Sequence, residues 1–241
     1  MISTSSTLYF LTVLGSVVAL GPAAVNLRTA ANYAILAKAG VSTLPPSVIT
    51  GNVAVSPISA LGLTNFSLAL DGTGQFSTST QVIGKVFAAS YAPTTPATLS
   101  VAVGDMGTAF TDATGRVSPN FMNLGSGAIG GLVLTPGLYK WTSAVTIGSN
   151  VTIIGGAADT WIFQVTGTLS IGAGQKVVLA GGALSSNIVW VVTGAVSAAA
   201  GAHLEGVILG QTSITLLTGA TANSRLLAQT SVVLQKATVT N

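Results

Sequence analysis

The C-terminal part of the chain repeats one short pattern. The stretch "TSITLLTGATANSRLLAQTSVVLQKA" contains Thr-Ser followed by alternating apolar residues twice, and Ala195, Ser213 and Ser231 open equally spaced copies. Earlier copies begin at Ala144 and Thr168 and are spaced more widely, as if loops were inserted. Repeats of this length that hold short strands and no helix predict a solenoid of parallel strands. The shortest copies leave room for three short strands per turn, which predicts a triangular section.

Every second residue of the repeat is apolar, and these residues predict a core. In a solenoid each strand pairs with the equivalent strand of the next turn, about 4.8 Å away, and alternate side chains point inward. The predicted inward residues are Val145, Ile147, Leu169, Ile171, Val196, Ala198, Ile214, Leu216, Val232 and Leu234. Burying each larger side chain contributes roughly 1.5–3 kcal/mol. Such a core allows a chain with 5% charged residues and no cysteine to fold without disulfides.

The remaining residues of the repeat predict two outward columns of small residues. One column is Ala144, Thr168, Ala195, Ser213 and Ser231, and the next is Thr146, Ser170, Ser197, Thr215 and Val233. Further candidates for the same surface are Thr212, Thr230, Ser42, Ser77 and Thr78. Exposed sheets usually carry Lys, Glu and Arg, so the uncharged columns favour a weakly polar binding surface. The alternative is that Thr and Ser are there because they suit strands.

Residues 95–114 have the apolar period of an amphipathic helix. Thr95 is the predicted N-terminal cap, Pro96 the first helical residue and Gly115 the stop. The predicted apolar stripe consists of Leu99, Val103, Met106, Phe110 and Ala113. We expect the helix to cover the side of the solenoid that holds Trp161, Phe163 and Trp190. The small-residue side would then stay open.

The N-terminus has the composition of a secretory signal peptide. A continuous apolar run extends from Leu8 to Val25 and ends in small residues, which predicts cleavage between Gly21 and Ala24. The expected organisation is a signal peptide over residues 1–24 and one extracellular domain over residues 25–241. A membrane anchor is the alternative, because no Lys or Arg precedes the run. Sequons at Asn65 and Asn150 fit a secreted product.

The charged residues do not form the clusters that catalysis or nucleic-acid binding requires. The eight Lys and Arg residues are scattered, so no basic tract predicts a nucleic-acid partner. Polysaccharide lyases and hydrolases also use β-helices, but they need clustered carboxylates. Here Asp105 and Asp112 lie two turns apart on the predicted helix, and the other three acidic residues are widely separated in sequence. Only the His203–Glu205 pair invites inspection, and a structural pair is the simpler interpretation. We therefore expect no catalytic residues, no metal and no cofactor.

Several longer motifs resemble one known family. The motifs are "ANYAILAKAGVSTLP", "SVITGNVAVSPISA", "STQVIGKVFAAS", "FTDATGR", "GLYKWTSAV", "IFQVTGTL" and "HLEGVILGQTSITLLTGATANSRLLAQ". In this order, over roughly residues 25–241, they resemble the β-helical ice-binding (antifreeze) proteins of snow-mould fungi, psychrophilic yeasts, sea-ice algae and bacteria.

The resemblance implies both a fold and a ligand. The implied fold is a discontinuous right-handed parallel β-helix of triangular section, with one long α-helix packed alongside and an N-terminal segment that closes the structure. The implied partner is an ice crystal surface, bound through one side of the solenoid. Binding would inhibit ice growth and recrystallisation. The mature protein is expected to be a monomer with no membrane contact. The small-residue columns are then the candidate ice-binding residues. A secreted matrix or adhesive protein that binds carbohydrate on the same scaffold stays open as an alternative.

Overall fold

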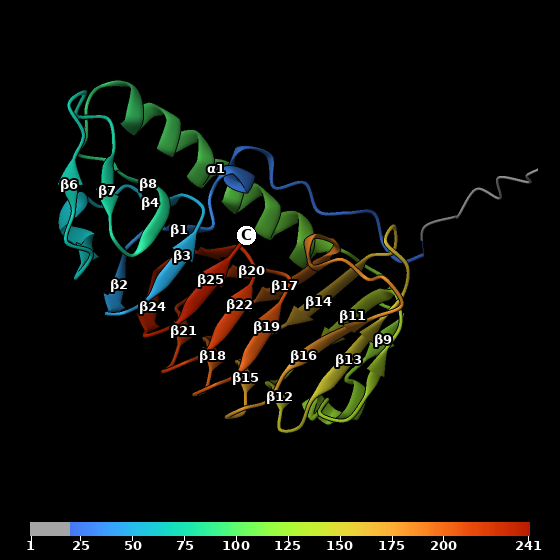
Figure 1. Cartoon of the computed structure of the whole chain (residues 1–241). Coiled ribbons are helices and arrows are strands. Elements are labelled where there is room, and N and C mark those ends of the chain that lie inside the picture. The colour runs from blue at the N-terminus through green and yellow to red at the C-terminus, as the bar shows by residue number, and fades with distance from the viewer. Residues whose placement is uncertain (1–19) are drawn as a thin grey trace, which may run out of the picture.

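The computed structural model describes residues 20–241 and shows a three-sided solenoid with one long helix along it (Figure 1). Residues 1–19, which hold most of the expected signal peptide, lie outside the described residues. Over residues 20–241 the predicted fold, mostly parallel strands with a single α-helix, is confirmed.

The small-residue face is a seven-stranded parallel sheet that runs along the lower edge of the solenoid in Figure 1. In spatial order its strands are β12 (Val145–Ile147), β15 (Leu169–Ile171), β18 (Val196–Ala198), β21 (Ile214–Leu216), β24 (Ser231–Gln235), β2 (Gly40–Leu44) and β5 (Leu63–Thr64).

The His203 face is turned toward the viewer in Figure 1. Its strands are β10 (Val133–Leu134), β13 (Val151–Ile154), β16 (Val177–Ala180), β19 (His203–Glu205), β22 (Thr221–Asn223), β25 (Thr238–Thr240) and β3 (Val48–Thr50). A parallel bridge between Lys176 and His203 joins its first three strands to the rest.

The helix face is the third side, and α1 (Thr94–Gly115) lies along it. Its strands are β9 (Phe121–Met122), β11 (Gly137–Trp141), β14 (Trp161–Val165), β17 (Ile188–Val192), β20 (Val207–Gly210), β23 (Leu226–Ala228), β1 (Ile35–Ala37) and β4 (Val53–Val55). No helix in residues 20–241 is long and apolar enough to cross a membrane.

The turns of the solenoid do not stack in the order of the sequence. The N-terminal strands continue from the last C-terminal turn, with β2 beside β24, β1 beside β23 and β3 beside β25. Beyond them β8 (Val82–Ala88) pairs with both β3 and β4, and it forms a short antiparallel cap with β7 (Ser77–Ser79) and β6 (Ala69–Leu70). The helix α1 then leads the chain back to the far end, where β9 begins (Figure 1). The β-helix is therefore discontinuous, as expected.

The solenoid interior is filled by the residues that the repeat predicts. All ten predicted inward side chains are at most 2% exposed. The longer turns hold the bulkier residues. All three tryptophans lie between positions 141 and 190, where the repeats are spaced most widely. There Phe163 packs against the tilted ring of Tyr139 and stacks on Trp190, with ring centroids 5.0 and 4.1 Å apart. Longer turns enclose a wider section, which the aromatic rings fill.

The helix covers the predicted side of the solenoid, but through different residues than expected. Trp161, Phe163 and Trp190 point into the solenoid. The side chains packed against α1 are their strand neighbours, among them Ile162, Val189, Val191, Leu209 and Leu227. These strands are buried on both sides, so apolar residues occupy every position and the sequence does not reveal which set faces the helix.

The contact side of α1 also differs in detail from the predicted stripe. Its buried residues include Leu99, Ala102, Met106, Ala109 and Ala113, whereas Val103 and Phe110 are only partly buried. Thr95 does not cap the helix, because its hydroxyl donates instead to the carbonyl of Gln75. At the other end, Gln164 Nε2 donates to the carbonyl oxygens of Ala113, Thr114 and Arg116. This amide satisfies the last carbonyls of α1 and fastens the helix to β14.

Candidate functional site

The strand register builds one of the two predicted columns without a gap. Thr146 pairs with Ser170, Ser170 with Ser197, Ser197 with Thr215, and Thr215 with Val233. Adjacent strands of a sheet lie about 4.8 Å apart. The predicted column therefore exists as a regular row across five turns.

The second predicted column lies one position before each inward residue that opens the strand. Ser231 begins β24 and pairs with Gly40 of β2, which continues the column with no side chain. The amide of Leu169 donates to the carbonyl of Ala195, and the amide of Val196 donates to the carbonyl of Ser213. Ala195 and Ser213 are therefore stacked from turn to turn in the same way. All five predicted members are exposed or partly exposed, namely Ala144, Thr168, Ala195, Ser213 and Ser231.

The five additional candidates have different locations. Ser42 pairs with Val233 and extends the row, which agrees with the prediction. Thr212 and Thr230 precede β21 and β24, at the corner toward the helix face. Ser77 and Thr78 do not extend the row, because β7 belongs to the antiparallel cap and not to the small-residue face. Ser77 is also buried, with its hydroxyl bonded to the Tyr91 hydroxyl at 2.6 Å.

The structure adds residues that the sequence pattern does not single out. Thr64 pairs with Ser42 and ends the row at β5, and Ala128 forms a bridge with Thr146 at the opposite end. Strands β24 and β2 are longer than the others and add Gln235 and Leu44 beside the row. The Leu-Thr alternation of β5 is a usable signal, but its distance from the preceding copy does not match the regular spacing of the C-terminal repeats.

The side chains of the small-residue face do not bond to one another. Its seven strands contain no charged and no aromatic residue. Thr146, Ser170, Ser197, Thr215 and Ser42 form no side-chain hydrogen bond within residues 20–241. Thr212 differs, because its hydroxyl is buried and has no partner within the same residues. The hydroxyls of the row are therefore available to molecules outside the protein.

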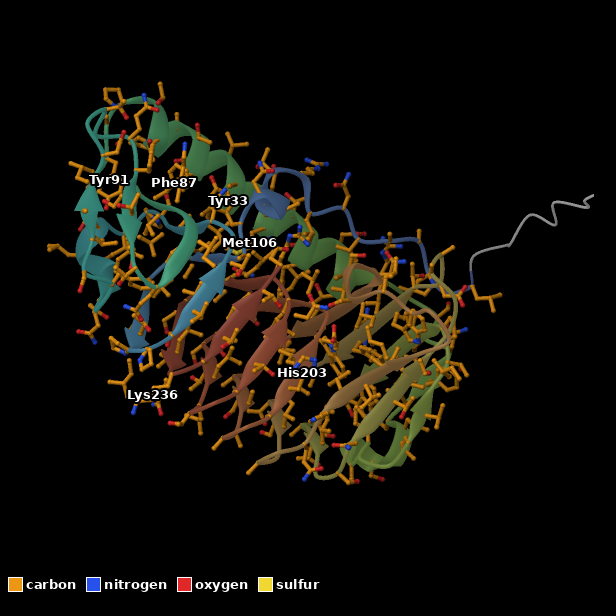
Figure 2. All side chains as sticks on the ribbon, viewed as in Figure 1. Tyr33, Phe87, Tyr91, Met106, His203 and Lys236 are labelled. Atoms are coloured by element: carbon orange, nitrogen blue, oxygen red, sulfur yellow. The ribbon has the colours of Figure 1, made fainter. Side chains whose placement is uncertain are left out.

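The His203 face has the opposite character. His203 lies near the middle of this face (Figure 2), with Nε2 2.9 Å from Glu205 Oε1 and Nδ1 2.7 Å from the Thr221 hydroxyl. Asn223 Nδ2 donates to the other Glu205 oxygen at 2.9 Å. This network spans β19 and β22 and supports the interpretation of His203 and Glu205 as a structural pair. Elsewhere on this face, bulky apolar side chains are exposed, among them Val133, Ile154 and Val178.

The acidic residues are used locally and do not converge. Asp112 forms a salt bridge with Arg116 at 2.8 Å, within the end of α1. Asp71 accepts from the Thr73 hydroxyl and from three backbone amides of its own loop, and these bonds lower its pKa to about 2. Asp105 accepts from the Thr29 hydroxyl and amide, and this lowers the pKa of Asp105. In the described part of the chain no three His, Asp or Glu side chains gather where they could hold a metal ion.

Known proteins share both the sequence and this fold. The family model described as ice-binding-like matches residues 35–240. The ice-binding protein K1-A of Typhula ishikariensis is 60% identical over 198 residues, which is 82% of each chain. The ice-binding protein of Flammulina populicola is 50% identical over 226 residues, covering 94% of this chain and 92% of its own.

Solved structures agree with the sequence relatives. One of them is LeIBP, an ice-binding protein with antifreeze activity from an Arctic yeast, which is 46% identical in sequence and has a TM-score of 0.89. The match covers 90% of this chain and 94% of the LeIBP chain. The DUF3494 domain of a Shewanella frigidimarina ice-binding protein, with 23% identity and a TM-score of 0.84, supports the fold alone. Because the family model spans most of the sequence and two relatives are 50% and 60% identical over the matched residues, the chain belongs to the ice-binding-like family.

Proposed function

We propose that this protein binds ice through its small-residue face and thereby inhibits ice growth and recrystallisation. The observation that carries the proposal is the row of unbonded Thr and Ser hydroxyls across successive turns, on a sheet without charge. Membership of the ice-binding-like family supports the same ligand, as do relatives that are named as ice-binding proteins.

The mechanism follows from how such a surface holds water. Each hydroxyl can anchor a water molecule, while the Thr methyl groups and Ala side chains bound that water with apolar surface. The rows repeat at the strand spacing of about 4.8 Å, and the packed interior keeps the strands rigid. Water held in this regular way joins the surface of an ice crystal. Bound molecules then force the ice front to grow as curved surfaces between them, which opposes growth.

The absence of charge on these strands is part of the same mechanism. A Lys or Glu side chain is long and rotates freely, and it orients water around an ion. Either property disturbs the ordered water layer. No covalent step, cofactor or metal takes part in this mechanism, and the ice surface is the only partner it requires.

We also propose that the protein acts outside the cell as a monomer. The apolar N-terminal run with small residues at its end has the composition of a secretory signal peptide. The chain has no cysteine, so the oxidising exterior does not affect it. Ice that threatens a cell surface forms in the external medium, where a secreted protein meets it.

A matched pair of substitutions tests the proposed face. Thr215→Tyr places a bulky ring in the middle of the row on β21, and Thr238→Tyr places the same ring on β25 of the His203 face. Both threonines are partly exposed, and neither side chain has a hydrogen bond within the described residues. We expect Thr215→Tyr to abolish shaping and arrest of ice crystals under a microscope, while Thr238→Tyr retains them.

Circular dichroism provides the control, because both variants should keep the wild-type spectrum. Full ice activity in a folded Thr215→Tyr variant contradicts the assignment of the face. Free ice growth with the wild type contradicts ice binding itself. The carbohydrate-binding alternative would then be tested against polysaccharide columns.

A further inference from the structure

The first described residues of the chain are held by a buried carboxylate. The backbone nitrogen of Leu20 donates to Asp159 Oδ1 at 2.7 Å, and the amide of Gly156 donates to Asp159 Oδ2 at 2.8 Å. Asp159 lies in the loop between β13 and β14 and is only 6% exposed. Within residues 20–241 no Lys, Arg or His lies within salt-bridge distance of it. Two neutral amides are weak compensation for a charge taken out of water.

The adjacent residues hold the same segment in place. The amide of Thr160 donates to the carbonyl of Leu20 at 2.9 Å, and the Thr160 hydroxyl donates to the carbonyl of Pro22. Gly21 has a φ of +101°, in the left-handed region, and a Cβ there would collide with the Thr160 carbonyl oxygen. Residues 20–22 therefore fit a specific site formed by Asp159 and Thr160.

We propose that the mature protein begins at Leu20, and that its new α-ammonium group forms an ion pair with Asp159. This inference rests on the proposed secretion, and it revises the cleavage site expected between Gly21 and Ala24. Cleavage inside that range would remove Leu20 and leave Asp159 with the Gly156 amide alone. Cleavage before Leu20 retains every contact and supplies the missing cation. The 2.7 Å distance from Leu20 N to Asp159 Oδ1 is within the range of charge-assisted hydrogen bonds.

The sequence before Leu20 suits a signal peptidase. Such enzymes favour small residues one and three positions before the cut. Ala19 stands one position before it, and the short β-branched Val17 stands three positions before it. Hydrolysis of the Ala19–Leu20 peptide bond consumes one water molecule. The hydroxyl bonds to the Ala19 carbonyl carbon, and the leaving nitrogen takes up protons to become the Leu20 ammonium. The cleavage thus creates the positively charged ammonium group that pairs with the Asp159 carboxylate.

N-terminal sequencing and the intact mass of the protein secreted by a eukaryotic host test the cleavage site. We expect a single species that starts at Leu20. A start between Pro22 and Leu27 overturns the inference while leaving secretion intact. A protein that keeps Met1 and stays in the cells contradicts both secretion and the processed terminus.

Thermal unfolding tests the ion pair separately from the cleavage. Protein released from a fusion with Leu20 as its first residue is compared with protein that carries a Ser-Gly extension, in which the Leu20 nitrogen is a neutral amide. We expect the extension to lower Tm by about 3 °C, and Asp159→Asn to remove the difference between the two forms. Equal Tm values for the two forms with Asp159 present overturn the ion pair. Because the extension alone gives this result, the test holds even if Asp159→Asn fails to fold.

Discussion

The small-residue face and the His203 face are two open sheets on one solenoid. They share the same turns and the same interior, and both face solvent. On the small-residue face, the side chains of the row are short, uncharged and without mutual hydrogen bonds. On the His203 face, His203, Glu205, Thr221 and Asn223 bond to one another, and bulky apolar residues are exposed on other strands of the face.

The two faces therefore share a backbone geometry, which the fold sets, and differ in their outward side chains, which the sequence sets. The solenoid gives both faces the same strand spacing, so spacing alone cannot select the ice-binding side. The side chains of His203, Glu205, Thr221 and Asn223 are occupied by internal bonds, whereas the hydroxyls of the row on the small-residue face are left for water. A face that organises external water needs groups that the protein itself does not use.

The largest expected effect comes from placing a charge on the small-residue face. Ser197→Lys introduces an ammonium group into the middle of the row, between Ser170 and Thr215. Because the charge orients its own hydration shell, we expect thermal hysteresis to fall about tenfold or more. Thr238→Lys on the His203 face is the matched control and should leave the activity unchanged. An equal loss in both variants would show that the two faces are not functionally distinct.

A smaller effect is expected from the His203 network. Glu205→Gln replaces the carboxylate that His203 and Asn223 contact, so we expect the free energy of unfolding to fall by about 0.5–1 kcal/mol. Urea unfolding monitored by circular dichroism measures this change. Ice activity should stay at the wild-type level, since the network does not touch the small-residue face. A loss of activity in a fully folded Glu205→Gln protein would extend the ice-binding site to this face.

The core and the row could be predicted from the sequence because both follow from local alternation. Strict alternation assigns Val196 and Ile214 to the interior and Ser197 and Thr215 to the outside, and the constant repeat length brings equivalent positions into register. Neither inference needs knowledge of distant contacts. These are the features that the structure reproduces residue by residue.

The features that could not be predicted depend on contacts between distant segments. The sequence pattern places Ser77 and Thr78 with the row, but the antiparallel cap turns that segment away. It also places Trp190 near the helix, but the strand of Trp190 is buried on both sides and gives no alternation. The pairing of β2 with β24 is set by the return of the chain along α1, which no repeat spacing encodes.

The smallest expected effect is the response of ice activity to pH. The small-residue face has no titratable side chain in its strands, and the single histidine of the chain lies on the His203 face. We therefore expect constant thermal hysteresis from about pH 8 to about pH 5, the range in which histidine side chains change charge. Stability should behave differently in stronger acid. The Thr29 hydrogen bonds lower the pKa of Asp105, so its contribution is present above the unfolded carboxyl pKa of about 3.9 and is lost as the pH falls through the folded value.

Measurements of thermal hysteresis and Tm across this pH range separate the two responses. A constant thermal hysteresis with a Tm that declines only below about pH 4 agrees with an uncharged ice-binding face. Asp105→Asn serves as the control, because it should flatten part of the acid decline in Tm and leave the activity unchanged. A step in thermal hysteresis between about pH 5 and about pH 8, with Tm constant, would instead assign His203 a part in ice binding. The His203 face would then be more than a structural side of the solenoid.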